Sequence, residues 1–275
     1  MAPRRGRGGG GISFGGDGPS VDPATLANIF SYVMLGLFGL CYLYVLVAMI
    51  QKRQSIFLHN VIGLITLSYL FTVLGGVTDI SLILAVPVFG RVGPVLAWLF
   101  ALEPSRRIMN LQSSDPNGDK TSIFNIKQYF RSGGVGYALL LAYVYAFAYT
   151  ICAIAYVADI SINGLSLATY ELNYFLNLST WLLFLIWICL VCFVHHSLIP
   201  HVKSLYYYGF FLLCGIVSVT VLIATYETWY DSLGRVILNF VLSDVTLFFA
   251  IYTALRYGSK WFNITKFDLT PNQQS

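Results

Sequence analysis

Two charged side chains inside apolar stretches are the residues of this sequence best suited to chemistry. Asp244 lies near the middle of the run VILNFVLSDVTLFFAIYTALR, residues 236–256, and Arg91 lies inside the apolar run from Ile80 to Leu102. A charge that faced lipid alone would cost several kcal/mol, so each group needs a partner or water. Groups of this kind serve as structural ion pairs, as proton relays or as ligand sites.

The depths of these two charges predict that they meet. A helix that begins near Arg235 places Asp244 roughly 13 Å deep, and a helix that begins near Ile80 at the same surface places Arg91 roughly 16 Å deep. The two depths agree within a helical turn. We therefore expect an ion pair between Asp244 and Arg91 inside a helix bundle, as a structural bridge or at the place where a ligand or a proton is felt.

Histidines are the remaining candidates for a metal site: His59, His195, His196 and His201. Imidazole is a ligand that zinc accepts, and three of the four lie close together in the sequence. However, no carboxylate stands at the spacing that a metal site would need, and the last apolar run contains no histidine. We expect these side chains at membrane boundaries, contacting headgroups or helix C-termini, with no bound metal. A metal-dependent membrane hydrolase is the enzyme alternative that they leave open.

The composition is that of a membrane protein. Charged residues make up 10% of the chain and apolar residues 57%, with a mean hydropathy of +0.72, whereas soluble domains have about 25% charged residues. A transmembrane helix needs about 20 predominantly apolar residues. The stretches that meet this length predict an all-α, seven-transmembrane helix bundle and are Asn28–Ile50, Phe57–Val77, Ile80–Leu102, Val135–Val157, Leu172–Val194, Leu205–Tyr226 and Val236–Tyr257.

Basic residues predict the orientation of this bundle. Lys and Arg collect in short cytoplasmic loops, and an N-terminus outside and a C-terminus in the cytoplasm put nearly all of them on the inner side: Lys52, Arg53, Arg106, Arg107, Lys120, Lys127, Arg131, Lys203, Arg256, Lys260 and Lys266. The outer loops then carry only Arg235 near a span. Which membrane of the cell holds the protein is not distinguishable from the sequence.

The predicted helical domain covers residues 28–258, with a long inner loop over 103–134. Residues 1–27 are Gly- and Arg-rich and are expected to form a disordered tail, a solvated leader rather than a nucleic-acid or headgroup ligand. Residues 259–275 form a cytoplasmic tail. Within the inner loop, the stretch IFNIKQYF could form an interfacial helix that anchors the loop, or else a surface for a protein partner.

Several short motifs resemble those of microbial rhodopsins and of the fungal opsin-related proteins. The first two spans, GLCYLYVLVAMIQKRQSIFLHNVIGLITLSYLFTVLGG, resemble the first hairpin of that family. The third span carries Arg91 in VFGR, followed by WLF, and the seventh carries LSDVTLFFAIYTALR. The family has an arginine with a nearby tryptophan in its third span, and an Asp-Val-x-x-Lys in its seventh whose lysine forms the retinal Schiff base.

In this chain Asp244 and Val245 match the seventh-span motif, and Phe248 stands at the lysine position. The resemblance therefore implies an opsin fold without covalent retinal and without another cofactor, and it adds Trp98 to Asp244 and Arg91 as a binding or relay candidate. The sequence departs from the family elsewhere. Trp98 is seven residues after Arg91, where the family has four, no acid lies between them, and the sixth span lacks the family's proline and tryptophans.

These observations predict a non-enzymatic sensor or receptor-like seven-helix module in a lipid bilayer. Its partners would be an unknown small ligand or a cytoplasmic protein, and not nucleic acid. The alternative is a small-solute or proton transporter that uses the Asp244 and Arg91 pair as its relay. The motifs D-R-Y and N-P-x-x-Y of the familiar G-protein-coupled receptors are missing from the third and seventh spans.

Overall fold

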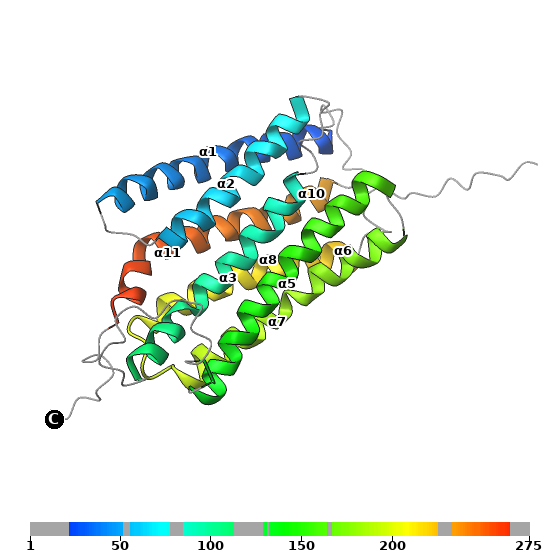
Figure 1. Ribbon diagram of the computed structural model, residues 1–275. Helices are drawn as coiled ribbons and strands as arrows, with labels where there is room; N and C mark the ends of the chain where they lie inside the picture. Colours follow the sequence, from blue (N-terminus) through cyan, green and yellow to red (C-terminus); the bar gives the residue numbers. More distant parts are fainter. Residues whose placement is uncertain are drawn as a thin grey trace, which may run out of the picture.

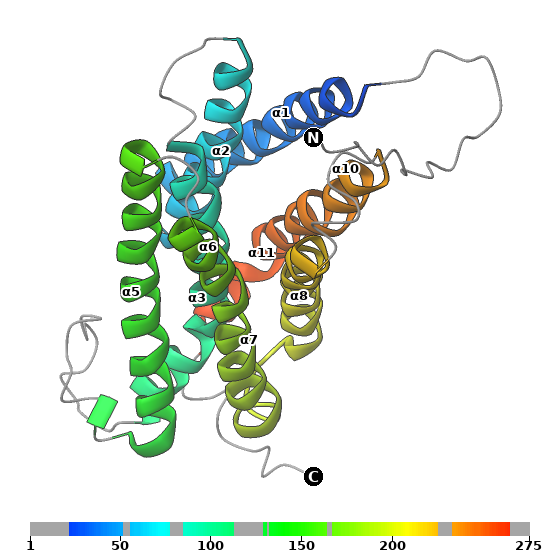
Figure 2. The same cartoon turned by 90° about the vertical axis from the view of Figure 1, so that its right-hand side faces the viewer.

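The computed structural model describes residues 22–51, 56–77, 85–112, 129–130, 132–163, 167–224 and 233–264. Within these ranges the protein is all-helical, and its main elements form seven rods that run back and forth (Figures 1 and 2). The rods are α1 (Pro23–Ile50), α2 (Ile56–Val77), α3 (Ala85–Gln112), α5 (Gly133–Asn163), α6 (Leu167–Ser179) with α7 (Trp181–Trp187) and the π-helical η3 (Ile188–Val194), α8 (Val202–Ala224), and α10 (Leu233–Asn239) with the π-helical η4 (Phe240–Val245) and α11 (Thr246–Phe262).

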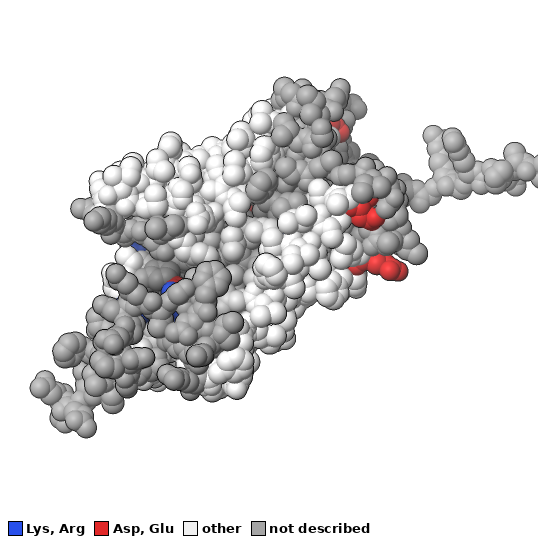
Figure 3. Space-filling view, in the orientation of Figure 1, with Lys and Arg blue, Asp and Glu red and all other residues white. Residues whose placement is uncertain are grey.

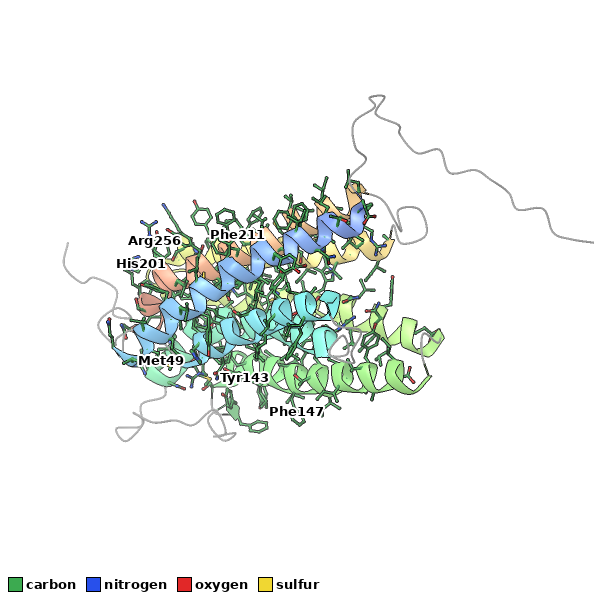
Figure 4. All side chains as sticks on the ribbon, turned by 90° about the horizontal axis from the view of Figure 1, so that it is seen from above. Met49, Tyr143, Phe147, His201, Phe211 and Arg256 are labelled. Carbon is green, nitrogen blue, oxygen red and sulfur yellow. The ribbon has the colours of Figure 1, made fainter. Side chains whose placement is uncertain are left out.

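Six of the rods are long and apolar enough to cross a membrane, judged on the described residues; α3 is the rod outside that set. This is the architecture of a multi-pass membrane protein. A large share of the apolar side chains points outward: Leu40 is 67% exposed, Phe147 70% and Phe193 80%. Figure 4 shows Phe147 directed away from the bundle. Exposed apolar side chains of this size fit contact with lipid hydrocarbon.

The helix bounds follow the predicted spans, with two informative differences. α1 begins at Pro23 rather than Asn28, because Asp22 accepts a hydrogen bond from the Thr25 backbone N–H at 3.1 Å and caps the helix ahead of Pro23. α3 continues past Leu102 to Gln112, so the first part of the predicted inner loop is helical. The predicted start of this span at Ile80 lies outside the described residues.

α3 is the central rod of the bundle. It contacts α2, α5, α7, α8 and α11. Its close approach to α2 depends on Gly93, because a Cβ at that position would lie 2.8 Å from the Ile65 side chain. Inside α3, Pro94 has no backbone N–H, so the carbonyl of Gly90, the residue next to Arg91, lacks its usual helical partner.

Charged residues separate to the two ends of the bundle. We call these the Pro23 end and the Ile50 end, after the first and last residues of α1. Figure 3 shows most of the visible acidic side chains at one end and the basic ones at the other, and Figure 4 places His201 and Arg256 toward the Ile50 end. The separation has the pattern that the orientation prediction requires, with the Ile50 end in the cytoplasm. The orientation itself, like the tail and loop assignments, stays a prediction.

Candidate functional site

Arg91 is held inside the bundle by neutral partners. Its guanidinium donates one hydrogen bond to Asn177 Oδ1 at 3.2 Å and another to Asn173 Oδ1, and it lies over the Tyr156 ring at 4.7 Å from the centroid. None of these three partners carries a negative charge. The group is therefore hydrogen-bonded, and stabilised by a cation–π contact, without a counter-ion among the described residues.

The two asparagines are positioned by the start of the fifth rod. Asn173 and Asn177 are one helical turn apart on α6, so their side chains share a face. Asn177 Nδ2 donates to Asn173 Oδ1 at 3.1 Å, which leaves both amide oxygens directed at Arg91. The amide side chains of Asn173 and Asn177 are therefore oriented toward Arg91 in the absence of a ligand.

A cavity of about 140 Å³ lies beside Arg91. Side chains of α3, α5, α6, α8 and the seventh rod line it, so it is enclosed by rods far apart in the sequence. Most of the described lining is apolar, and among these described lining residues Arg91 is the only charged one. Polar groups around it include Asn177, Thr180 and Ser243.

Trp98 forms the floor of this cavity toward the Ile50 end. It is 2% exposed, and its indole meets the rings of Phe184 and Trp187, each at 5.9 Å and nearly edge-on. The ring of Trp187 is in turn pressed against α8 at Gly209, where a Cβ would lie 2.4 Å from the indole. The structure therefore brings two of the three predicted site residues, Arg91 and Trp98, to one cavity.

Asp244 has a different partner. The Tyr69 hydroxyl of α2 donates to Asp244 Oδ1 at 2.6 Å. Asp244 belongs to η4, a π-helical segment in the middle of the seventh rod. Single π turns inside α-helices are rare and occur frequently at functional sites.

The predicted ion pair between Asp244 and Arg91 is wrong. Among the described residues the one ion pair joins Arg106 to Glu103, near the end of α3. The prediction of similar depth agrees with the structure, because Ser243, the neighbour of Asp244, lines the cavity beside Arg91. What differs is direction: Asp244 turns toward Tyr69 on α2, whereas Arg91 turns toward α5 and α6.

Asp244 also borders a second hollow, of about 350 Å³, between α1, α8 and the seventh rod. Phe30 and Phe240 stack in its wall with ring centroids 3.8 Å apart. Arg235 and Asn239 line it from α10, the part of the seventh rod nearest the Pro23 end. The π turn thus has Ser243 at the Arg91 cavity and Asp244 at this hollow.

The four histidines do not come together. The His59 ring lies tilted against Tyr42, with ring centroids 4.8 Å apart, and His196 contacts the Tyr206 hydroxyl. His195 is buried at 2% exposure, and His201 is exposed. In the described part of the chain, no three His, Cys, Asp or Glu side chains are grouped as metal ligands.

Phe248, at the position of the family's retinal lysine, faces α1 rather than the cavity. Its ring meets Phe38 edge-on at 6.0 Å, and it is Leu247 that lines the cavity.

Sequence reasoning missed Tyr69, Asn173 and Asn177. The two asparagines left a signal, because amides one turn apart within an apolar span need a buried partner. Tyr69 gave little signal in the sequence, since it is one of 19 tyrosines.

No protein-family model, curated protein or solved structure matches this chain. The resemblance to opsin-related proteins therefore stays a prediction, and function has to be argued from the site.

Proposed function

We propose that this protein is a non-enzymatic sensor, a receptor-like seven-helix module that binds a small ligand in the cavity between Arg91 and Trp98. The observation that carries the proposal is the prepared guanidinium at this cavity: Arg91 is oriented by Asn173 and Asn177 and borders space for a ligand. Ligand sites have this character, being mostly apolar with a few placed polar groups.

The π turn supplies a route from ligand to response. Ser243 lines the cavity, and the next residue, Asp244, holds the Tyr69 hydroxyl of α2. A ligand that favours one arrangement of η4 would therefore also change the contact between the seventh rod and α2. Coupling of this kind requires an element with two arrangements, and a π turn inside an α-helical rod is a suitable one.

Transport is the second candidate, and one observation favours it. Asp244 borders the hollow toward the Pro23 end, while its neighbour borders the Arg91 cavity. A solute or a proton that passed between the two spaces would cross the bundle at the π turn, with Asp244 as the relay.

Vesicle uptake separates the two functions. The full chain is reconstituted into liposomes with a solute gradient, and accumulation is compared with protein-free liposomes and with an Asp244→Asn variant. A sensor binds the solute without accumulating it. Accumulation above the protein-free level that Asp244→Asn abolishes would overturn the sensor proposal in favour of transport.

A further inference from the structure

The Arg91 cavity carries a positive charge that no described residue compensates with a negative one. The half-buried guanidinium of Arg91 keeps its positive charge, because arginine does not lose its proton in proteins. Its described contacts are two amide oxygens, the Tyr149 hydroxyl and the Tyr156 ring, all neutral. Removing a cation from water without an opposite charge is costly even when its hydrogen bonds are made. An anion in the cavity would relieve this cost.

These contacts do not use all the N–H donors of the Arg91 guanidinium. A guanidinium has five N–H groups in a planar fork that matches a carboxylate. The hydrogen bonds to Asn177 and Asn173 use Nη1 and Nη2 and hold the plane of the group in place. Since Arg91 also lines the cavity, an anion there would meet an oriented partner.

The remaining lining selects an organic anion. Pro94, Leu212, Ile216, Val219 and Leu247 surround the space, and the Trp98 ring closes it. An apolar cavity of about 150 Å³ holds a benzene molecule, and this one measures about 140 Å³. The favoured occupant thus has one acidic group and an apolar body of a few carbons.

We infer that the cavity binds a small organic monoanion, a short-chain or aromatic monocarboxylate, with the carboxylate on Arg91 and the apolar body against Trp98. This inference rests on the proposed function, since it names the ligand class of the same site. An amine would repel Arg91, and a neutral isostere would leave its charge uncompensated.

Binding to the full chain in lipid nanodiscs tests the inference. The probes are benzoate, its neutral isostere benzamide, and the series acetate, propionate, butyrate and valerate, each measured by calorimetry. Benzoate should bind and benzamide should not. Within the series the affinity should rise about four-fold per methylene, as burial of a CH₂ group predicts. Flat affinity along the series, with chloride competing equally, would show an inorganic anion site and overturn the inference.

Two variants assign the binding to this cavity. Arg91→Gln should weaken benzoate binding about 10- to 100-fold, the value of a hydrogen bond to a charged group. Arg256→Gln is the matched control, because Arg256 is an exposed arginine at the Ile50 end and should leave binding unchanged. If Arg91→Gln does not fold, Gly215→Leu fills the cavity while retaining Arg91, and it should abolish binding.

The outcomes for ligand class and for function differ. Benzoate binding that survives both Arg91→Gln and Gly215→Leu, or the absence of any carboxylate binding to folded wild type, overturns the ligand class. Carboxylate binding accompanied by uptake into vesicles leaves the ligand class intact and overturns the sensor proposal.

Discussion

The Tyr69 hydroxyl donates to Asp244 Oδ1 at 2.6 Å and joins α2 to the π turn of the seventh rod. This contact explains how a carboxyl group is accommodated within a long apolar run. The carboxyl has a hydrogen-bond donor on one side and a hollow on the other, so it neither faces lipid alone nor requires Arg91.

Removing the Tyr69 hydroxyl should destabilise the protein. Tyr69→Phe takes away a hydrogen bond to an acidic group, which is worth about 1.5–3 kcal/mol when that group is charged. Thermal unfolding in detergent measures the loss. Tyr143→Phe is the matched control, because the Tyr143 hydroxyl is buried and has no hydrogen-bond partner among the described residues. That control should be neutral or stabilising, and equal losses in the two variants would contradict the role of Tyr69.

Separate partners for Asp244 and Arg91 predict additive mutations. Asp244→Leu should cost about 1–3 kcal/mol, since it leaves the Tyr69 hydroxyl without its acceptor. Arg91→Leu removes contacts to a different set of residues. The double variant should equal the sum of the singles within about 0.5 kcal/mol, measured by thermal unfolding. If the double variant were more stable than this sum predicts, Asp244 and Arg91 would have to form an ion pair after all.

A side chain at Gly209 should destabilise the protein. A Cβ there would lie 2.4 Å from the Trp187 indole, which is 4% exposed and packed between Trp98, Phe184 and Tyr206. Gly209→Ala should therefore cost about 1–3 kcal/mol through overpacking. Gly39→Ala, in α1 with open space around its Cβ, should be neutral or slightly stabilising. The two variants are compared by thermal unfolding, and equal stability would show that Trp187 moves freely.

Added retinal should form no covalent pigment. Phe248 stands where the opsin family has its lysine, and no lysine lies within the predicted spans. Purified protein incubated with retinal should show no visible band that hydroxylamine bleaches, because a Schiff base requires a primary amine. Such a band would mean that a lysine outside the spans reaches the bundle interior.

The sequence was sufficient to place the helices. Runs of about 20 apolar residues locate the rods, because hydrophobic length is a local property, but they miss several helix ends, such as the extension of α3 from Leu102 to Gln112. α1 differs at its start because the cap at Asp22 lies outside the apolar run. Arg91 was identifiable because a charge within a helix bundle needs a partner, whereas Trp98 was a candidate only through the resemblance to opsin-related proteins.

The direction of each side chain could not be predicted from the sequence in the same way. Depth along a helix follows from residue counting, but rotation about the helix axis depends on how all the rods pack. Rotation decides that Asp244 meets Tyr69 while Ser243 meets the cavity. The π turn adds to this, because the extra residue in η4 changes the rotation of everything after it, and periodicity of 3.6 residues does not anticipate it.

Hydrogen exchange of the segment Phe240–Val245 tests the account most directly, because η4 is the element that would pass a ligand signal from the Arg91 cavity to Tyr69. Wild type in nanodiscs is compared with and without saturating benzoate, beside Arg91→Gln under the same conditions. We predict slower exchange of η4 amides in wild type on adding benzoate and no change in Arg91→Gln. Unchanged exchange of this segment in ligand-saturated wild type would contradict the account.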